Sequence, residues 1–94
     1  ADAKSRWRVS DDVIARRLGD EVIVVQLKTD RVYALNDSAA RIWELVASGR
    51  SVREIQRAVA EEFAVDPAIL ERSIRRLLSR LNSRRLLDVR ARGS

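Results

Sequence analysis

The sequence predicts an α+β fold in which a three-stranded antiparallel sheet precedes three helices. Between residues 13 and 35, apolar and β-branched runs alternate with short polar turns, a pattern typical of strands. From residue 37 onward, apolar residues recur every three to four positions, as in amphipathic helices. A chain of 94 residues is long enough for one domain.

The three strands are expected within the first 35 residues. The first covers Val13–Leu18, and Gly19-Asp20 forms the two-residue turn of a hairpin. The second, Glu21–Leu27, is almost continuously apolar, which favours the middle of a small sheet. The four residues 28–31 then turn the chain into Val32–Leu35, which we expect at a sheet edge. An unpaired edge accepts an extended segment of another chain unless it is covered.

The first two helices carry clear start and stop signals. Asn36 or Asp37 caps the first helix, and Gly49 ends it. Ser51 and Glu54 have the spacing of a capping box, which opens the second helix. The expected core stripes are Ala39, Ile42, Trp43 and Val46 in the first helix and Val52, Ile55, Val59 and Phe63 in the second.

The third helix begins at Asp66-Pro67, because Asp is a good cap and Pro fits the first helical position. Asn82 or Ser83 ends it. Leu78 lies beside the expected core stripe, where either core packing or a half-exposed binding contact fits, and core packing is favoured. The stripe itself consists of Leu70, Ile74, Leu77 and Leu81.

The two ends of the chain are more polar than the middle. We expect residues 1–11 to be a mobile segment in which only Trp7 and Val9 act as apolar anchors. Residues 12–89 form the folded domain, with Leu86, Leu87 and Val89 packing back on it. Residues 90–94 are expected to form a disordered tail.

The charge is basic and unevenly distributed. Nineteen Lys and Arg against 14 Asp and Glu give a formal net charge of +5, so an acidic partner is plausible. Solvated helix faces explain any single arginine equally well. The arginines crowd the third helix at Arg72, Arg75, Arg76, Arg80, Arg84 and Arg85.

The composition argues against catalysis and against a cofactor. The chain contains no Cys and no His, which excludes thiol nucleophiles, imidazole bases and the usual zinc sites. No paired carboxylates and no glycine-rich phosphate loop stand out, so we expect no enzyme activity, no metal and no cofactor. No apolar run approaches the about 18 residues of a membrane span, and residues 1–6 lack a signal-peptide core, so a cytoplasmic protein is expected.

One block of the sequence resembles a known family. Tyr33–Trp43 reads Tyr-x-Leu-Asn-x-x-Ala-Ala-x-Ile-Trp and is the most specific element, and it follows Asp20-Glu21-Val22 and precedes Val65-Asp66-Pro67. On these motifs, residues 11–89 are similar to the PqqD-like family. The resemblance implies a compact winged helix-turn-helix domain that recognises ribosomally made, post-translationally modified peptides. Such a domain performs no chemistry. It holds the leader segment of a precursor peptide for a modifying enzyme.

The resemblance also implies a binding site. The leader would add as a strand to the third strand and lie in the cleft between that strand and the third helix. Val32, Tyr33, Ala34 and Leu35 would supply the strand edge, and Ile74, Arg75 and Leu78 would supply the helix wall.

Within the family, the run Thr-Asp-Arg-Val-Tyr-Ala-Leu-Asn at 29–36 looks more like the leader-binding partners of lasso-peptide maturation. The resemblance then implies a separate leader peptidase, or another modifying enzyme, as the acceptor. The chain departs from the family pattern at Asp30, where glycine commonly makes the turn, although Asp tolerates the left-handed region better than most residues.

Three alternatives remain open from the sequence. The first is a peptide chaperone of the pyrroloquinoline quinone pathway. The second is a DNA-binding winged-helix regulator, which is disfavoured because Ala68, Ile69 and Leu70 open the third helix where base-reading residues would stand. The third is a module that dimerises through the same strand edge, and either a monomer or a homodimer is consistent with the sequence.

Overall fold

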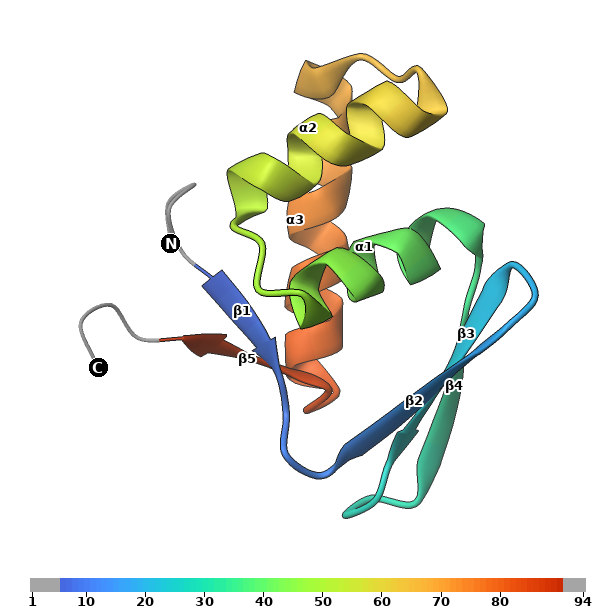
Figure 1. The fold of residues 1–94 in the computed structure, drawn as a ribbon. Coiled ribbons are helices and arrows are strands. Elements are labelled where there is room, and N and C mark those ends of the chain that lie inside the picture. Colours follow the sequence, from blue (N-terminus) through green and yellow to red (C-terminus); the bar gives the residue numbers. More distant parts are fainter. Residues whose placement is uncertain (1–5, 91–94) are drawn as a thin grey trace.

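The structure is a computed structural model, and it describes residues 6–90 (Figure 1). Five strands and three helices follow one another in this part of the chain. They are β1 (Arg6–Val9), β2 (Val13–Leu18), β3 (Glu21–Gln26), β4 (Arg31–Leu35), α1 (Asp37–Ala47), α2 (Val52–Phe63), α3 (Pro67–Ser83) and β5 (Leu87–Arg90). The predicted α+β class, with a three-stranded antiparallel sheet and three helices, is confirmed.

The three-stranded sheet has the order β2-β3-β4, and both pairs are antiparallel. Gly19 takes a positive φ of 62° in the turn between β2 and β3, as a two-residue hairpin requires. Asp30 takes a φ of 56° in the next turn, so it occupies the left-handed conformation that glycine would otherwise supply. Val22 and Val24 of the central strand are buried.

The helix caps follow the sequence signals. The Asn36 side chain accepts the Ala39 N–H at 3.1 Å, which identifies Asn36 as the cap of α1. Ser51 and Glu54 form both bonds of the capping box of α2. The Asp66 carboxylate accepts the Ala68 N–H at 2.8 Å, with Pro67 at the first position of α3.

A second, two-stranded sheet corrects the expectation for the chain ends. Residues 6–9 were expected to be mobile, but they form β1 and pair antiparallel with β5, with Arg6 opposite Arg90 and Val9 opposite Leu87. Trp7 and Val9 are half-buried against the core, and Leu87 of β5 is fully buried. Arg90 therefore belongs to a strand rather than to a tail, and residues 1–5 and 91–94 lie outside the described residues.

The core-facing side of α3 differs from the expected stripe at one position. Leu78 is 1% exposed and belongs to the core, whereas Leu77 is only half-buried at its margin. Both positions fall within the arc that faces the neighbouring elements, and the packing partners decide which one is covered. Leu70, Ile74 and Leu81 are buried as predicted.

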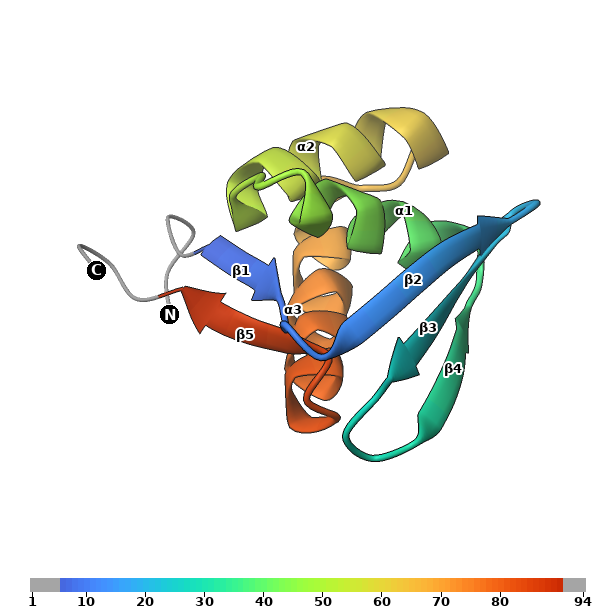
Figure 2. The ribbon, with the colours of Figure 1, turned by 60° about the horizontal axis from the view of Figure 1, so that its bottom comes forward.

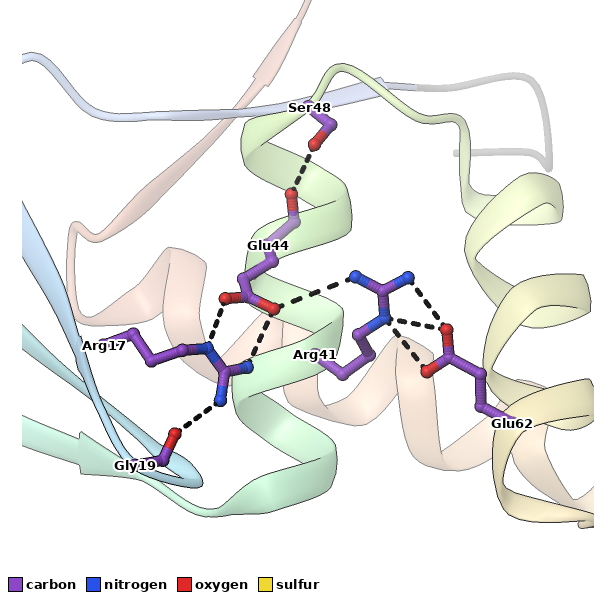
Figure 3. A network of polar contacts seen from close by, with 6 residues as sticks. All are labelled: Arg17, Gly19, Arg41, Glu44, Ser48 and Glu62. Carbon is purple, nitrogen blue, oxygen red and sulfur yellow. Dashed lines mark hydrogen bonds and ion pairs between the residues drawn. The ribbon is translucent and has the colours of Figure 1, made fainter.

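An ion-pair network fastens the β2 side of the sheet to two helices (Figure 3). The Arg17 guanidinium donates to both carboxylate oxygens of Glu44 on α1, at 2.7 and 2.8 Å, and to the Gly19 carbonyl at 2.7 Å. Arg41 lies 3.8 Å from Glu44 and donates at 2.9 Å to Glu62 on α2. These donors lower the pKa of Glu44, first through the hydrogen bonds from Arg17 and then through the charges of Arg17 and Arg41.

Across residues 6–90, none of the helices combines the length and the apolar character that crossing a lipid bilayer requires.

Candidate functional site

Strand β4 forms one edge of the three-stranded sheet, and Figure 2 shows it as the outer strand beyond β3. Its only strand partner among the described residues is β3. The N–H and C=O groups on the other side of β4 therefore have no ladder to join. Such a row of backbone groups is a template for one further strand.

One hydrogen bond, between the residue before β2 and the residue after β3, shows which residues of β3 bond to β2 and which bond to β4. The Leu27 N–H donates to the Asp12 carbonyl at 2.8 Å, so this opposed pair is of the hydrogen-bonded type. In an antiparallel ladder, hydrogen-bonded and non-bonded pairs alternate. Positions 21, 23 and 25 of β3 therefore bond to β2, and Val22, Val24 and Gln26 direct their backbone groups to β4.

The same alternation identifies the outward-facing positions of β4. Residues 31, 33 and 35 stand opposite Gln26, Val24 and Val22, so their backbone groups are used within the sheet. Val32 and Ala34 consequently direct their N–H and C=O groups away from β3, toward the open edge. The two residues are spaced as alternate pairing positions of an added strand.

The side chains of β4 also alternate between two faces. Leu35 is buried and Tyr33 is half-buried on the face that carries Val24, whereas Val32 is 64% exposed on the opposite face. The Arg84 guanidinium lies 5.0 Å from the centre of the Tyr33 ring. This cation–π contact joins β4 to the end of α3.

A cavity of about 400 Å³ opens between the start of β4 and the end of α3. Three arginine side chains line it, and no carboxylate does. We call this cavity the basic pocket, and its lining residues are Thr29, Arg31, Tyr33, Ser83, Arg84 and Arg85.

Gln26 connects the two walls of the basic pocket through hydrogen bonds. The residue is 2% exposed, and its side chain donates to the Arg85 carbonyl at 2.6 Å and accepts the Lys28 N–H at 2.8 Å. Arg85 has a positive φ of 61°, a conformation that costs free energy in a non-glycine residue and needs outside support. One buried amide therefore joins the β3–β4 turn to the end of α3.

The structure does not bring the expected helix-wall residues to this edge. Ile74 and Leu78 are 0% and 1% exposed, so their side chains belong to the core. Arg75 pairs with Glu71 at 3.4 Å. It lies nine positions before Arg84, which at about 3.6 residues per turn places the two on opposite sides of α3.

Leu78 packs in the core, as favoured from the sequence, and the neighbouring Leu77 is the partly exposed leucine. Leu77 lies seven positions before Arg84, so at about 3.6 residues per turn both side chains fall on the same side of α3. The Arg84 contact with Tyr33 shows that this side faces β4. Leu77 is half-buried, which leaves part of its side chain accessible.

Two features of the site escaped the sequence analysis. Arg84 and Arg85 stood out only as members of an arginine-rich helix, although their position directly after the helix end was a usable signal. Arg31 was assigned to a turn, whereas it is the first residue of β4. In residues 6–90, no group of three acidic, His or Cys side chains is arranged to hold a metal ion.

Comparison with known proteins shows the family to which the chain belongs. The family model described as coenzyme PQQ synthesis protein D (PqqD) matches residues 21–87. The chain belongs to the PqqD family. The match begins at β3 and ends at the start of β5, so it includes β4, α3 and the basic pocket. None of the curated proteins matches the chain.

Two solved structures resemble this PqqD-family chain over nearly its whole length. One is TbiB1 in complex with the TbiA(beta) leader peptide, with 33% sequence identity, a TM-score of 0.85 and coverage of 89% of this chain and 98% of that one. The other is lasso peptide synthetase B1 complexed with the leader peptide, with a TM-score of 0.81 and coverage of 88% and 98%. At 19% identity, the second supports the fold alone.

Proposed function

We propose that this PqqD-family protein is a recognition element for the leader segment of a ribosomally made precursor peptide. The observation that carries the proposal is the open edge of β4, where Val32 and Ala34 direct their backbone groups outward. The similarity to TbiB1, whose structure contains a leader peptide, supports the same role. Within this role we propose the lasso-peptide type of pathway over the pyrroloquinoline quinone pathway, because of the run Thr-Asp-Arg-Val-Tyr-Ala-Leu-Asn at 29–36.

Binding proceeds by strand addition. The free leader is disordered, and its ordering costs conformational entropy that the new contacts must offset. Main-chain hydrogen bonds to Val32 and Ala34 supply affinity with little dependence on sequence, because every residue except proline offers the same N–H and C=O groups. Sequence choice then depends on the side-chain contacts beside the strand.

The helix side of the site supplies those contacts. Leu77 offers a partly accessible apolar surface on the side of α3 that faces β4. Tyr33 of β4 offers a half-buried ring, which contacts Arg84. We therefore assign the helix wall to Leu77 and Arg84 in place of Ile74, Arg75 and Leu78.

The protein itself is proposed to be non-catalytic. Without Cys or His, the chain lacks the side chains that most often act as nucleophile or general base near neutral pH. Its contribution is to raise the local concentration of the precursor at a separate leader peptidase or another modifying enzyme. The proposed role places it in the cytoplasm, where a ribosomally made peptide first becomes available.

The proposed fold label is a winged helix-turn-helix, with α2 and α3 as the helix-turn-helix and the β2–β3–β4 sheet as the wing (Figure 1). This architecture is shared with DNA-binding regulators, so the ligand must be tested directly.

A pair of titrations tests the proposal. A labelled leader segment of a candidate precursor peptide and a labelled random DNA duplex are each titrated with the full chain at near-physiological salt. We expect saturable binding of the leader and only weak, salt-sensitive binding of the duplex, since phosphate contacts are lost to competing counterions. Tight duplex binding without leader binding would overturn the proposal.

A further inference from the structure

We infer that the basic pocket is a carboxylate subsite, which holds one Asp or Glu side chain of the bound leader. The inference rests on the proposed function, because the pocket adjoins the edge at which the leader would pair. Arg31, which lines the pocket, directly precedes the outward-facing Val32 in β4. A leader residue next to the one paired at Val32 therefore lies within reach of the pocket.

The pocket carries uncompensated positive charge. Among residues 6–90, no carboxylate forms an ion pair with Arg31, Arg84 or Arg85, and no acidic side chain lines the cavity. Other arginines in the same part of the chain do pair with acidic residues, as Arg17 and Arg41 do. An anion entering the pocket would relieve the mutual repulsion of three guanidinium groups.

One of the three arginine side chains, and the backbone of a second arginine, are held in place before any ligand arrives. Arg84 is stacked on the Tyr33 ring, and the backbone of Arg85 is fixed by the buried Gln26 side chain. Binding then immobilises fewer freely rotating side chains, which lowers its entropic cost. The planar guanidinium fork donates two parallel hydrogen bonds to a carboxylate, so an ordered arginine selects this group by geometry as well as by charge.

A double-mutant cycle with calorimetric titration tests the subsite. Arg84→Gln is combined with leader peptides in which each acidic residue is replaced, one at a time, by its amide. We expect Arg84→Gln to weaken binding of the unmodified leader about tenfold, in line with hydrogen bonds to charged groups. One amide leader should lose a similar factor with the wild-type protein, and should lose little more when the two changes are combined.

Arg76→Gln is the matched control. It removes the same charge, from α3 itself, and Arg76 is exposed and does not line the basic pocket. Leader affinity should remain unchanged in this variant. Arg31→Gln repeats the cycle from the other wall of the pocket, in case Arg84→Gln does not give a cooperative thermal melt.

The outcomes separate the subsite from the proposed function. Unchanged leader affinity in folded Arg84→Gln and Arg31→Gln would overturn the subsite but leave leader recognition intact. The same holds if the bound segment of the leader has no acidic residue. If the wild-type chain does not bind the leader, both conclusions fail. If the variants lose binding only of a random DNA duplex, the pocket serves nucleic-acid phosphate instead and the inference is overturned.

Discussion

At the scale of single residues, Gln26 is the polar group on which the site geometry depends most. It is a buried amide, and both ends of the amide are hydrogen-bonded, to the Arg85 carbonyl and to the Lys28 N–H. A buried polar side chain is tolerated when its bonds are made and costly when they are not. Gln26 therefore stabilises the turn before β4 and the chain reversal after α3 together.

Gln26→Leu tests this role. The variant keeps a similar volume but leaves the Arg85 carbonyl and the Lys28 N–H without their partner, so we expect a loss of about 1–3 kcal/mol in the free energy of unfolding. Urea denaturation monitored by tryptophan fluorescence measures it. Gln56→Leu on α2 is the control, because Gln56 is half-buried and its change should stay within about 0.5 kcal/mol. Equal stability of the Gln26 variant and the wild type would argue against the assigned role.

At the scale of secondary-structure elements, the two edges of the sheet have different environments. The β2 side is tied to α1 and α2 through Arg17, Glu44, Arg41 and Glu62 (Figure 3). The β4 side contacts α3 through Tyr33 and Arg84 and keeps its outer backbone groups open. The network links the β2 side of the sheet to the helices, whereas the proposed leader-binding edge at β4 has no strand partner among residues 6–90 beyond β3.

Proline substitutions in β4 separate binding from folding. Ala34→Pro removes an N–H that points away from β3, so the variant should keep a cooperative melt and lose leader binding. Tyr33→Pro removes an N–H used in the ladder with Val24, so it should also destabilise the sheet. Circular dichroism melts and leader titrations measure both effects. If Ala34→Pro binds the leader as tightly as the wild type, the leader does not pair at this position.

The ion-pair network predicts a pH-dependent effect of Glu44→Gln. The arginines lower the pKa of Glu44 from its ordinary value of 4.5, so its ionised form contributes stability above that pH. This contribution is lost as the pH falls through the lowered pKa. With the side chain 34% exposed, solvent screening limits it to at most about 1 kcal/mol.

Urea denaturation of the wild type and Glu44→Gln near pH 7 and about pH 3 measures this difference. Glu44→Gln should be less stable than the wild type near neutral pH, and the gap should narrow at the acidic pH. Glu61→Gln on the exposed side of α2 is the control and should match the wild type near pH 7. A gap for Glu44→Gln that widens toward acid would contradict the assigned pairing.

At the scale of the whole molecule, local signals predicted the elements and distant contacts determined the rest. The β2–β3–β4 hairpins and the caps at Asn36, Ser51 and Asp66 depend on residues close in sequence, and all of them were predictable. The pairing of β1 with β5 joins the two ends of the described chain. Short strands of this kind depend on packing partners that a local pattern does not contain.

The candidate site was predictable in part: its edge strand was, but its outward-facing residues and its helix wall were not. The edge position of residues 32–35 was predictable from the order of the strands. Which residues of β4 face outward was not, because it depends on which opposed pairs of the ladder are hydrogen-bonded. The proposed helix wall depends on which of the adjacent Leu77 and Leu78 is buried, and the structure buries Leu78 in the core. The basic pocket depends on Arg85 adopting a left-handed conformation after α3, which no propensity favours for arginine.

Amide hydrogen exchange resolved by nuclear magnetic resonance tests the central claim of strand addition at β4. In the free protein, the N–H groups of Val32 and Ala34 face an open edge and should exchange faster than that of Tyr33, which bonds to β3. Saturation with the leader should slow exchange at Val32 and Ala34 because their N–H groups enter a new ladder. A bound leader that leaves the exchange rates of both amides unchanged would contradict the account.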